Sequence, residues 1–161
     1  MGIKCNTSRS YLDNINKQIT DIIREEIKRT LSYLGEQCVA RVRDRSAEES
    51  WIDQTGNLRS SIGYAVYDQG RKAMQSAFAI VKQGAQGAAE GQQYIDSLAK
   101  EYAKTYALVV VAGMNYAEYV EARDNKDVLA STELWAKAKV EEYMKRSQER
   151  AERRINGLLS A

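Results

Sequence analysis

A single apolar stripe constrains this chain more than any other feature. Between Ser10 and Arg45, apolar residues recur every three or four positions. An α-helix turns once every 3.6 residues, so this spacing puts them on one side of a helix. The stripe consists of Ile15, Ile19, Ile22, Ile23, Ile27, Leu31, Leu34, Cys38 and Val42. Gly35 interrupts it at a cost of about 1 kcal/mol relative to alanine, so we expect a bend or break there and one or two helices over residues 10–45.

The segment after this helix has the composition of a turn followed by a hairpin. Thr55-Gly56-Asn57 is typical turn chemistry and ends the helical periodicity. Beyond it, side chains alternate over residues 62–67 and again over residues 74–81, and Asp68-Gln69-Gly70 separates the two runs. Alternation with a period of two is the pattern of a β-strand. The sequence predicts an antiparallel hairpin.

The second half of the chain returns to helical spacing, then forms a strand and a last helix. We expect a helix over roughly residues 88–104, and a β-branched run at residues 106–112 indicates the most buried strand, covered on both faces. Ser131 and Thr132 are candidate caps of the last helix, with Glu133 in its first turn. The charged second half of this helix has too little apolar surface to be deeply buried within one subunit.

Together these elements predict an α+β fold. A small antiparallel β-sheet packs with a long N-terminal helix, an inserted middle helix and a long C-terminal helix. The chain has no proline, no long polar linker and no repeat of fixed period. We therefore expect a single domain over residues 1–161.

The composition argues against most enzymes. The chain has no histidine, which removes the commonest general base and metal ligand, so we expect no catalytic set, no metal and no cofactor. Cys5 and Cys38 are predicted free thiols, and Cys38 lies on the apolar stripe, where a buried structural thiol is expected rather than a nucleophile. The net charge of +2 does not by itself require a nucleic-acid or membrane partner. No apolar run reaches the ~20 residues of a membrane span, and we expect the chain to stay in the cytoplasm where it is made.

Two charged clusters keep alternative functions open. Acidic side chains could serve a metal-dependent nuclease or be solvated loop charges, and the second reading is favoured. These side chains are Glu118, Glu121, Asp124 and Asp127. The basic cluster Arg150, Arg153 and Arg154 is interleaved with glutamates, which favours a solvated helix face over a partner surface, with DNA contact a minority of the latter.

The chain has ten tyrosines but one phenylalanine. Tyrosine has an apolar body and a polar tip, which suits surfaces that are wet in a monomer and buried on assembly. Tyr106, Tyr116 and Tyr119 are therefore either interface residues or the half-buried rim of an ordinary core.

Two segments carry a resemblance to a known family. Trp51-Ile52-Asp53-Gln54-Thr55-Gly56-Asn57-Leu58-Arg59-Ser60-Ser61-Ile62 resembles a signature in which a Thr-Gly-x-Leu-Arg-x-Ser-Ile loop follows a long first helix. Met114-Asn115-Tyr116-Ala117-Glu118-Tyr119-Val120-Glu121 resembles its later Tyr-Ala-x-Tyr-Val-Glu partner. Together they are similar to the putative tail-component, or head-tail joining, family of long-tailed bacteriophages. The helix expected near residues 88–104 departs from that family's pattern.

The resemblance implies a non-enzymatic structural virion protein that is assembled in the bacterial cytoplasm. It implies a homo-oligomeric ring in the neck, between the portal-side connector and the tail terminator or tail tube, with non-specific contact with packaged DNA left open. The rival functions are a small carboxylate- and metal-dependent nuclease and a nucleic-acid-binding module.

We expect the two motif segments to lie together and to form subunit or partner contacts. The candidate interface residues are Trp51, Thr55, Gly56, Asn57, Leu58, Arg59, Tyr116, Tyr119 and Glu121. Reversing the charge of Arg59 or Glu121 should then abolish head-tail joining and leave the monomer folded.

Overall fold

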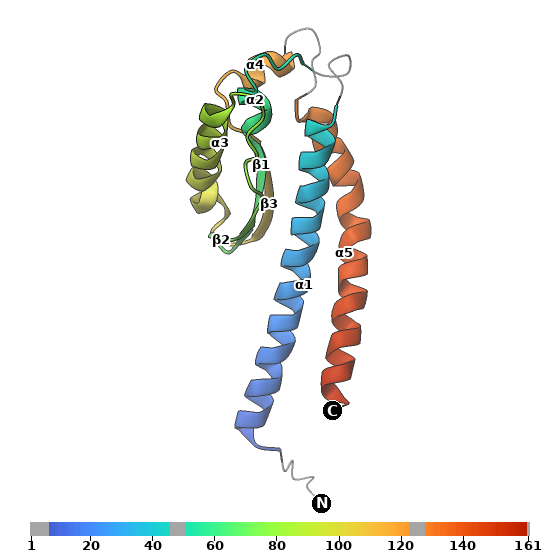
Figure 1. The fold of residues 1–161 in the computed structure, drawn as a ribbon. Helices are drawn as coiled ribbons and strands as arrows, with labels where there is room; N and C mark the ends of the chain where they lie inside the picture. Colours follow the sequence, from blue (N-terminus) through green and yellow to red (C-terminus); the bar gives the residue numbers. More distant parts are fainter. Residues whose placement is uncertain (1–6, 46–50, 123–127, 161) are drawn as a thin grey trace, which may run out of the picture.

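Helix α1 (Arg9–Arg43) is one continuous helix of 35 residues, so the bend expected at Gly35 is wrong (Figure 1). The computed structural model describes residues 7–45, 51–122 and 128–160. A Cβ atom on Gly35 would lie 2.5 Å from the Cδ2 atom of Tyr64. The missing side chain therefore lets the ring of Tyr64 lie directly against the helix backbone, and this contact accounts for a glycine inside the helix.

The sheet has three antiparallel strands in the order β2 (Arg71–Gln75), β1 (Ile62–Asp68), β3 (Tyr106–Ala112). The turn between β1 and β2 has positive φ at both Gln69 (51°) and Gly70 (79°). This is the backbone pattern of the tight turns that match strand twist in hairpins. The predicted hairpin is confirmed, but the position of its second strand is wrong. This strand shares only residues 74 and 75 with the predicted run over residues 74–81, and the rest of that run is not in a strand.

Strand β1, and not β3, is the most buried strand, so that prediction is wrong. Strand β1 has a neighbour on each side, whereas β3 lies at an edge of the sheet. The side chains of β3 do pack on both faces of the sheet, but five of its seven residues are only partly buried. A β-branched run indicates the two covered faces, but it does not tell an edge strand from a central one.

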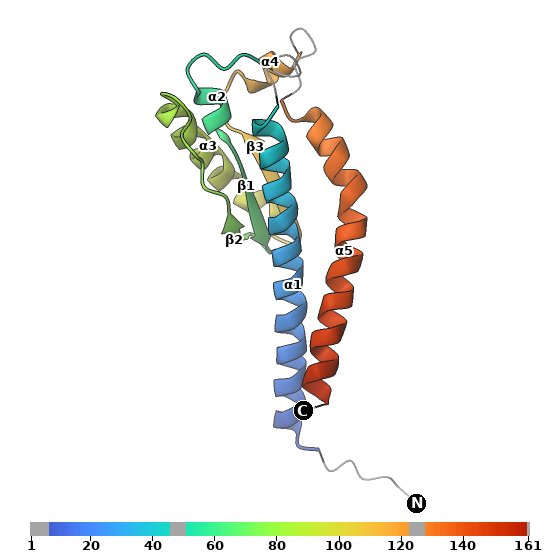
Figure 2. The ribbon, with the colours of Figure 1, turned by 45° about the vertical axis from the view of Figure 1, so that its right-hand side comes forward.

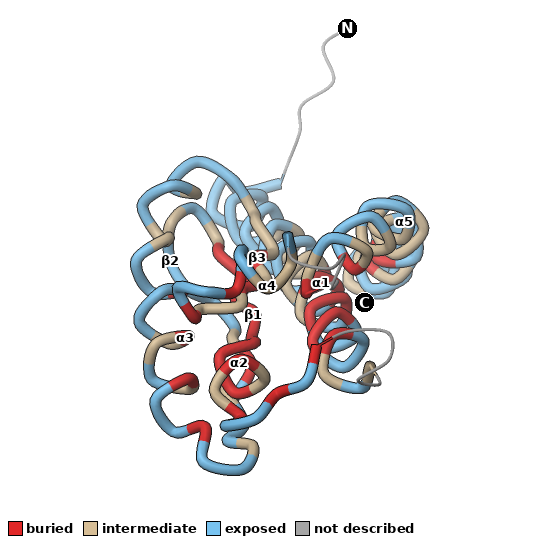
Figure 3. Tube along the Cα trace, turned by 90° about the horizontal axis from the view of Figure 1, so that it is seen from above, coloured by how far each residue is buried: buried red, intermediate tan, exposed pale blue. Residues whose placement is uncertain are grey.

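The sheet, the upper part of α1 and the elements between α1 and the last helix form a globular part of the molecule, hereafter called the head, and the sheet is its middle layer, between two helices (Figure 1). Helix α1 covers one face and α3 (Ala85–Ser97) covers the other, and buried residues gather along α1, β1 and the short helix α2 (Asn57–Ser60) (Figure 3). The larger core lies on the α1 side. It contains Leu31, Val39, Val42, Trp51, Leu58, Ile62, Tyr64, Val66, Met114, Ala117 and Val128.

The smaller core lies between the sheet and α3, and it includes Tyr67 and Ile95. The predicted middle helix is confirmed, with an earlier start. Its last residues form a separate 3₁₀ helix, η1 (Leu98–Tyr102).

Helix α5 (Ala130–Leu159) runs alongside α1, and the two helices together extend well beyond the sheet (Figures 1 and 2). Its predicted caps are wrong, because the helix begins at Ala130 and has no capping bond from its own neighbouring side chains. Ser131 and Thr132 instead accept hydrogen bonds from the guanidinium of Arg45, at 2.7 and 2.6 Å. They join α5 to the segment that follows α1.

Ion pairs between α1 and α5 hold the lower part of the helix pair together. The carboxylate of Glu26 accepts hydrogen bonds from Arg150 (2.8 Å) and Arg154 (3.1 Å), and its side chain is 3% exposed. The buried residues of α5 at this level are small, Ser147 and Ala151. A solvated face is the right description for the exposed Arg153. It does not describe Arg150 and Arg154, which cross to α1.

Candidate functional site

The structure brings the two motif segments together at the same end of the head, where α2 and α4 (Ala117–Ala122) both lie (Figures 1 and 2). Trp51 and Leu58 from the first segment belong to the same core cluster as Met114 and Ala117 from the second. Segments about sixty residues apart thus form one structural unit. This is the juxtaposition that the resemblance led us to expect.

Asp53 organises the first segment, although sequence reasoning did not single it out. Its buried carboxylate accepts hydrogen bonds from the backbone N–H groups of Gly56 (2.9 Å) and Arg59 (3.0 Å). Aspartate side chains commonly bond the backbone a few residues ahead, so an Asp three residues before the glycine of a turn was the available signal. The Asn57 side-chain oxygen also supports this segment, because it accepts a hydrogen bond from the backbone N–H of Gly87 in α3 at 3.2 Å.

Arg59 closes the end of α1. Its guanidinium donates to the backbone carbonyls of Arg43 and Arg45, the latter at 3.1 Å, and it lies over the Trp51 ring at 5.3 Å. A cation near the carbonyl end of a helix opposes the negative end of the helix dipole. Arg59 is therefore built into the monomer, and we no longer expect a charge reversal there to leave the fold intact.

Glu121 binds backbone groups at the start of α5, as Arg59 does at the end of α1. Its carboxylate accepts hydrogen bonds from the backbone N–H groups of Leu129 (2.9 Å) and Ala130 (2.6 Å). Those groups begin the helix and would otherwise lack partners within it. Glu121 is a cap supplied by α4, and its charge reversal is likewise expected to perturb the fold.

The remaining predicted interface residues divide into buried and exposed. Trp51, Gly56 and Leu58 are buried, Asn57 is half-buried and Thr55 is exposed. Tyr116 and Tyr119 are 37% and 63% exposed. Burial raises the pKa of the Tyr116 hydroxyl, and the charges of Asp53 and Glu90 raise it further. Ile52 is also 75% exposed, so this end of the head presents several apolar or aromatic side chains to solvent.

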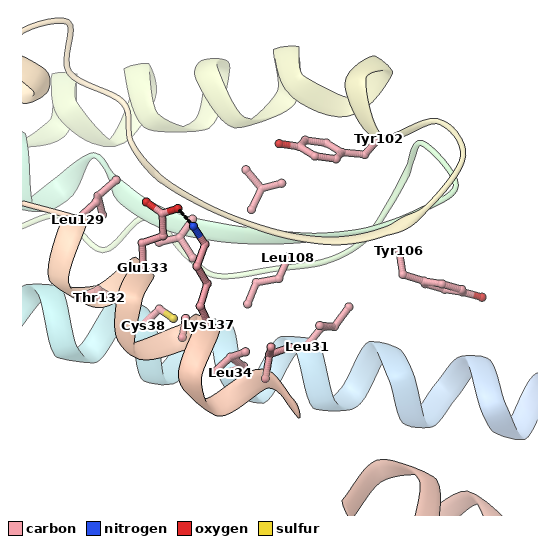
Figure 4. A pocket seen from close by; sticks show the side chains of 14 residues that line it. Leu31, Leu34, Cys38, Tyr102, Tyr106, Leu108, Leu129, Thr132, Glu133 and Lys137 are labelled. Carbon is pink, nitrogen blue, oxygen red and sulfur yellow. Dashed lines mark ion pairs between the residues drawn. The ribbon is translucent and has the colours of Figure 1, made fainter. Parts of the chain in front are cut away.

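A second feature, which the sequence did not indicate, is an apolar groove beside β3. Its floor includes Leu31, Leu34 and Cys38 of α1, and its walls are β3 and the first turns of α5 (Figure 4). The space is about 520 Å³. An ion pair between Glu133 and Lys137 of α5, 2.5 Å between nitrogen and oxygen, lies beside it.

Cys38, on the floor of this groove, is an unreactive thiol. It is 1% exposed, and burial raises the pKa of its thiol to about 11. The thiol is thus protonated at neutral pH, whereas a nucleophile requires the thiolate. This confirms the prediction of a buried, structural thiol, while Cys5 lies outside the described residues.

Of the four acidic residues proposed as a nuclease site, only Glu118 and Glu121 lie in the described part of the chain, one helical turn apart on α4. Glu121 caps α5, Glu118 is exposed on α4, and Asp124 and Asp127 lie outside the described residues. Within residues 7–45, 51–122 and 128–160, no group of three or more potential metal ligands occurs. Over the same residues, no helix combines the length and apolar character that a bilayer span requires.

Comparison with known proteins adds no relative. No protein-family model matches the sequence, and neither the curated proteins nor the solved structures include a match.

Proposed function

We propose that this chain is a non-enzymatic structural subunit of a tailed-bacteriophage virion. It forms a homo-oligomeric ring at the head-tail junction and connects the portal-side connector to the tail terminator or tail tube. The chain is made in the bacterial cytoplasm and incorporated into the neck of the particle.

The observation that carries this proposal is the meeting of the two motif segments at one end of the head. The residues that fix their shape are internal: Asp53, Arg59 and Glu121 brace the backbone from within. The side chains around them, Ile52 and Tyr119, are exposed. A rigid, aromatic and partly apolar surface of this kind suits a protein contact.

The long helices also favour a subunit that neighbours complete. Helix α1 has no buried residue before Glu26, although Ile15, Ile19 and Ile22 lie on its apolar stripe and are only half-covered. Apolar surface that stays half-exposed in a monomer gains free energy when another chain covers it.

Cryo-electron microscopy of intact particles tests the proposal. We expect a ring of this chain between portal and tail tube, and Ile52→Asp should stop head-tail joining while the purified chain stays folded. Ile80→Asp is the matched control, because Ile80 is 62% exposed in the same globular part of the subunit but lies outside both motif segments.

Absence of the chain from the particle would overturn the proposal. Metal-dependent DNA cleavage by the purified chain would then support the nuclease. DNA binding that weakens steeply with salt would support the nucleic-acid-binding module, because phosphate contacts release counterions.

A further inference from the structure

We propose that successive copies join edge to edge, with strand β2 of one copy adding to the open edge of β3 on the next. This inference rests on the proposed ring and names the surface that builds it. It is carried by the sheet topology, by the hollows that flank β3 and by the charges at the two edges.

Among the described residues, no strand pairs with the outer edge of β3. The N–H of Gly113 bonds to Ser61 O, and the N–H of Gln69 bonds to Thr105 O, so the β1–β3 ladder pairs the odd-numbered residues of β3 with β1. In an antiparallel pair, the residues that bond the partner strand alternate with residues whose N–H and C=O groups point away from it. The outward groups therefore belong to Leu108 and Val110. An unpaired edge of this kind is a template for another strand.

Both faces beside this edge are hollowed. The apolar groove lies on the α1 side, against Leu108. A second hollow of about 370 Å³ lies along β3 between η1 and α4, and its lining includes Val111, Leu98 and Tyr94. Side chains of a strand point alternately to opposite faces, so an added strand would place its side chains in both hollows.

Strand β2 is the complementary edge. It lies at the other side of the same sheet, and its residues Arg71 to Met74 are all exposed. Both β2 and β3 run antiparallel to β1, so they run parallel to each other. Every copy thus offers one donor edge and one acceptor edge that point in opposite directions across the sheet. Such a head-to-tail contact generates a ring when its rotation closes.

The charges at the two edges are complementary. Glu101 and Glu118 line the hollow beside β3, are exposed, and form no ion pair within the described residues. Arg71 begins β2 and has no acidic partner among the described residues, whereas the neighbouring Lys72 is already paired with Asp96 of α3. Charges of opposite sign steer two surfaces together and disfavour pairing of like edges, such as β3 with β3. A second copy therefore fits the β3 edge better than an uncharged peptide would.

Disulfide trapping in particles tests this contact. Cys5→Ser removes one native thiol, and the buried Cys38 does not react, so new cysteines report the interface. We would combine Ala73→Cys on β2 with Ala107→Cys or Ala112→Cys on β3, which samples two registers with small-to-small changes. Oxidation should then give a ladder of cross-linked multimers only from chains that carry both cysteines.

A proline gives an independent test in soluble protein. Val110→Pro removes an N–H that points away from β1, so the monomer should keep its circular dichroism spectrum and lose self-assembly in sedimentation experiments. Val109→Pro is the contrast, because its N–H faces β1 and its loss should unfold the sheet. Arg71→Glu should weaken self-assembly at least tenfold, and Arg71→Lys should retain it.

The outcomes separate this inference from the proposed function. A ring in the particle without β2–β3 cross-links, or with cross-links between two β3 strands, overturns the edge contact and leaves the ring function standing. Absence of the chain from the particle overturns both.

Discussion

Glu26 and Arg150 lie 124 residues apart in the sequence and form a 2.8 Å ion pair that joins α1 to α5. Arg154 adds a second bond to the same carboxylate. The pair is the main polar connection in the part of the helix pair that lies beyond the sheet, where buried residues are few and small. Its contribution to stability is therefore open to direct measurement.

Glu26→Gln should lower the free energy of unfolding by about 2 kcal/mol, measured by urea denaturation. Loss of one partner of a buried pair costs about 3–5 kcal/mol, and the partial exposure of Arg150 (35%) and Arg154 (44%) reduces this through solvent screening. Glu25→Gln is the matched control, because Glu25 also pairs with Arg154 but is 60% exposed, and it should cost less than about 0.5 kcal/mol. Equal costs for the two variants would contradict a special role for Glu26.

The same carboxyl should make stability depend on pH. Burial raises the pKa of Glu26, but the hydrogen bonds and charges of Arg150 and Arg154 outweigh it, so the folded-state pKa is lowered. A lowered pKa stabilises the fold above the unfolded pKa of about 4.3, and this is lost as pH falls through the folded value. Wild type and Glu26→Gln should thus differ by a constant amount above about pH 5.5 and converge in acid. A difference that persists undiminished at pH 3 would refute this.

Gly35→Ala should destabilise the head by about 1–3 kcal/mol, because the new methyl group would meet the Tyr64 ring at 2.5–2.8 Å. Gly157→Ala in α5 serves as the control, since nothing lies within 4 Å of its Cβ position. That change should be neutral or stabilise by less than about 1 kcal/mol. Thermal unfolding of both variants measures the contrast, and a stabilising Gly35→Ala would show that Tyr64 does not press on the helix.

Glu121→Ala should cost about 1 kcal/mol by removing the cap of α5. Hydrogen exchange at the backbone amides of Leu129 and Ala130 should accelerate, since both lose their acceptor. Glu118→Ala on the same helix should change neither quantity. Unchanged exchange in Glu121→Ala would show that another group caps the helix.

Arg59→Glu should destabilise the monomer by more than about 2 kcal/mol, because it places a carboxylate against the carbonyls at the end of α1 and removes the contact with Trp51. Arg71→Glu, at an exposed position on β2, should leave the free energy of unfolding within about 0.5 kcal/mol of wild type. Chemical denaturation followed by tryptophan fluorescence reports both. A stable, folded Arg59→Glu variant would return Arg59 to the surface role first expected of it.

Local patterns were enough to predict the long helices, the middle helix, the three strands and the α+β class, but not the short helices α2 and α4. The apolar stripe of α1, the alternation of β1 and the β-branched run of β3 all reflect periodicities that a single segment carries. The errors concern partners distant in sequence. Gly35 is explained only by Tyr64, and the cap of α5 comes from Glu121 on another helix.

The candidate site was predicted in the same uneven way. The juxtaposition of the two motif segments was expected, but Arg59 and Glu121 were predicted to be subunit or partner contacts. Their actual acceptors and donors are backbone groups at helix ends, which a sequence does not display. The groove beside β3 depends on the angle between α5 and the sheet, and no segment encodes that angle alone.

The helix pair also determines how this protein would respond to tension. Arg9 at the start of α1 and Leu159 at the end of α5 belong to the same end of the pair, away from the head (Figure 1). A force that pulled these two helix ends apart would break the contacts between α1 and α5 in sequence, one helical turn at a time, and not all at once. The ion pairs of Glu26 with Arg150 and Arg154 lie on that path, so they would have to break before the separation of the helices reaches the sheet and the two motif segments.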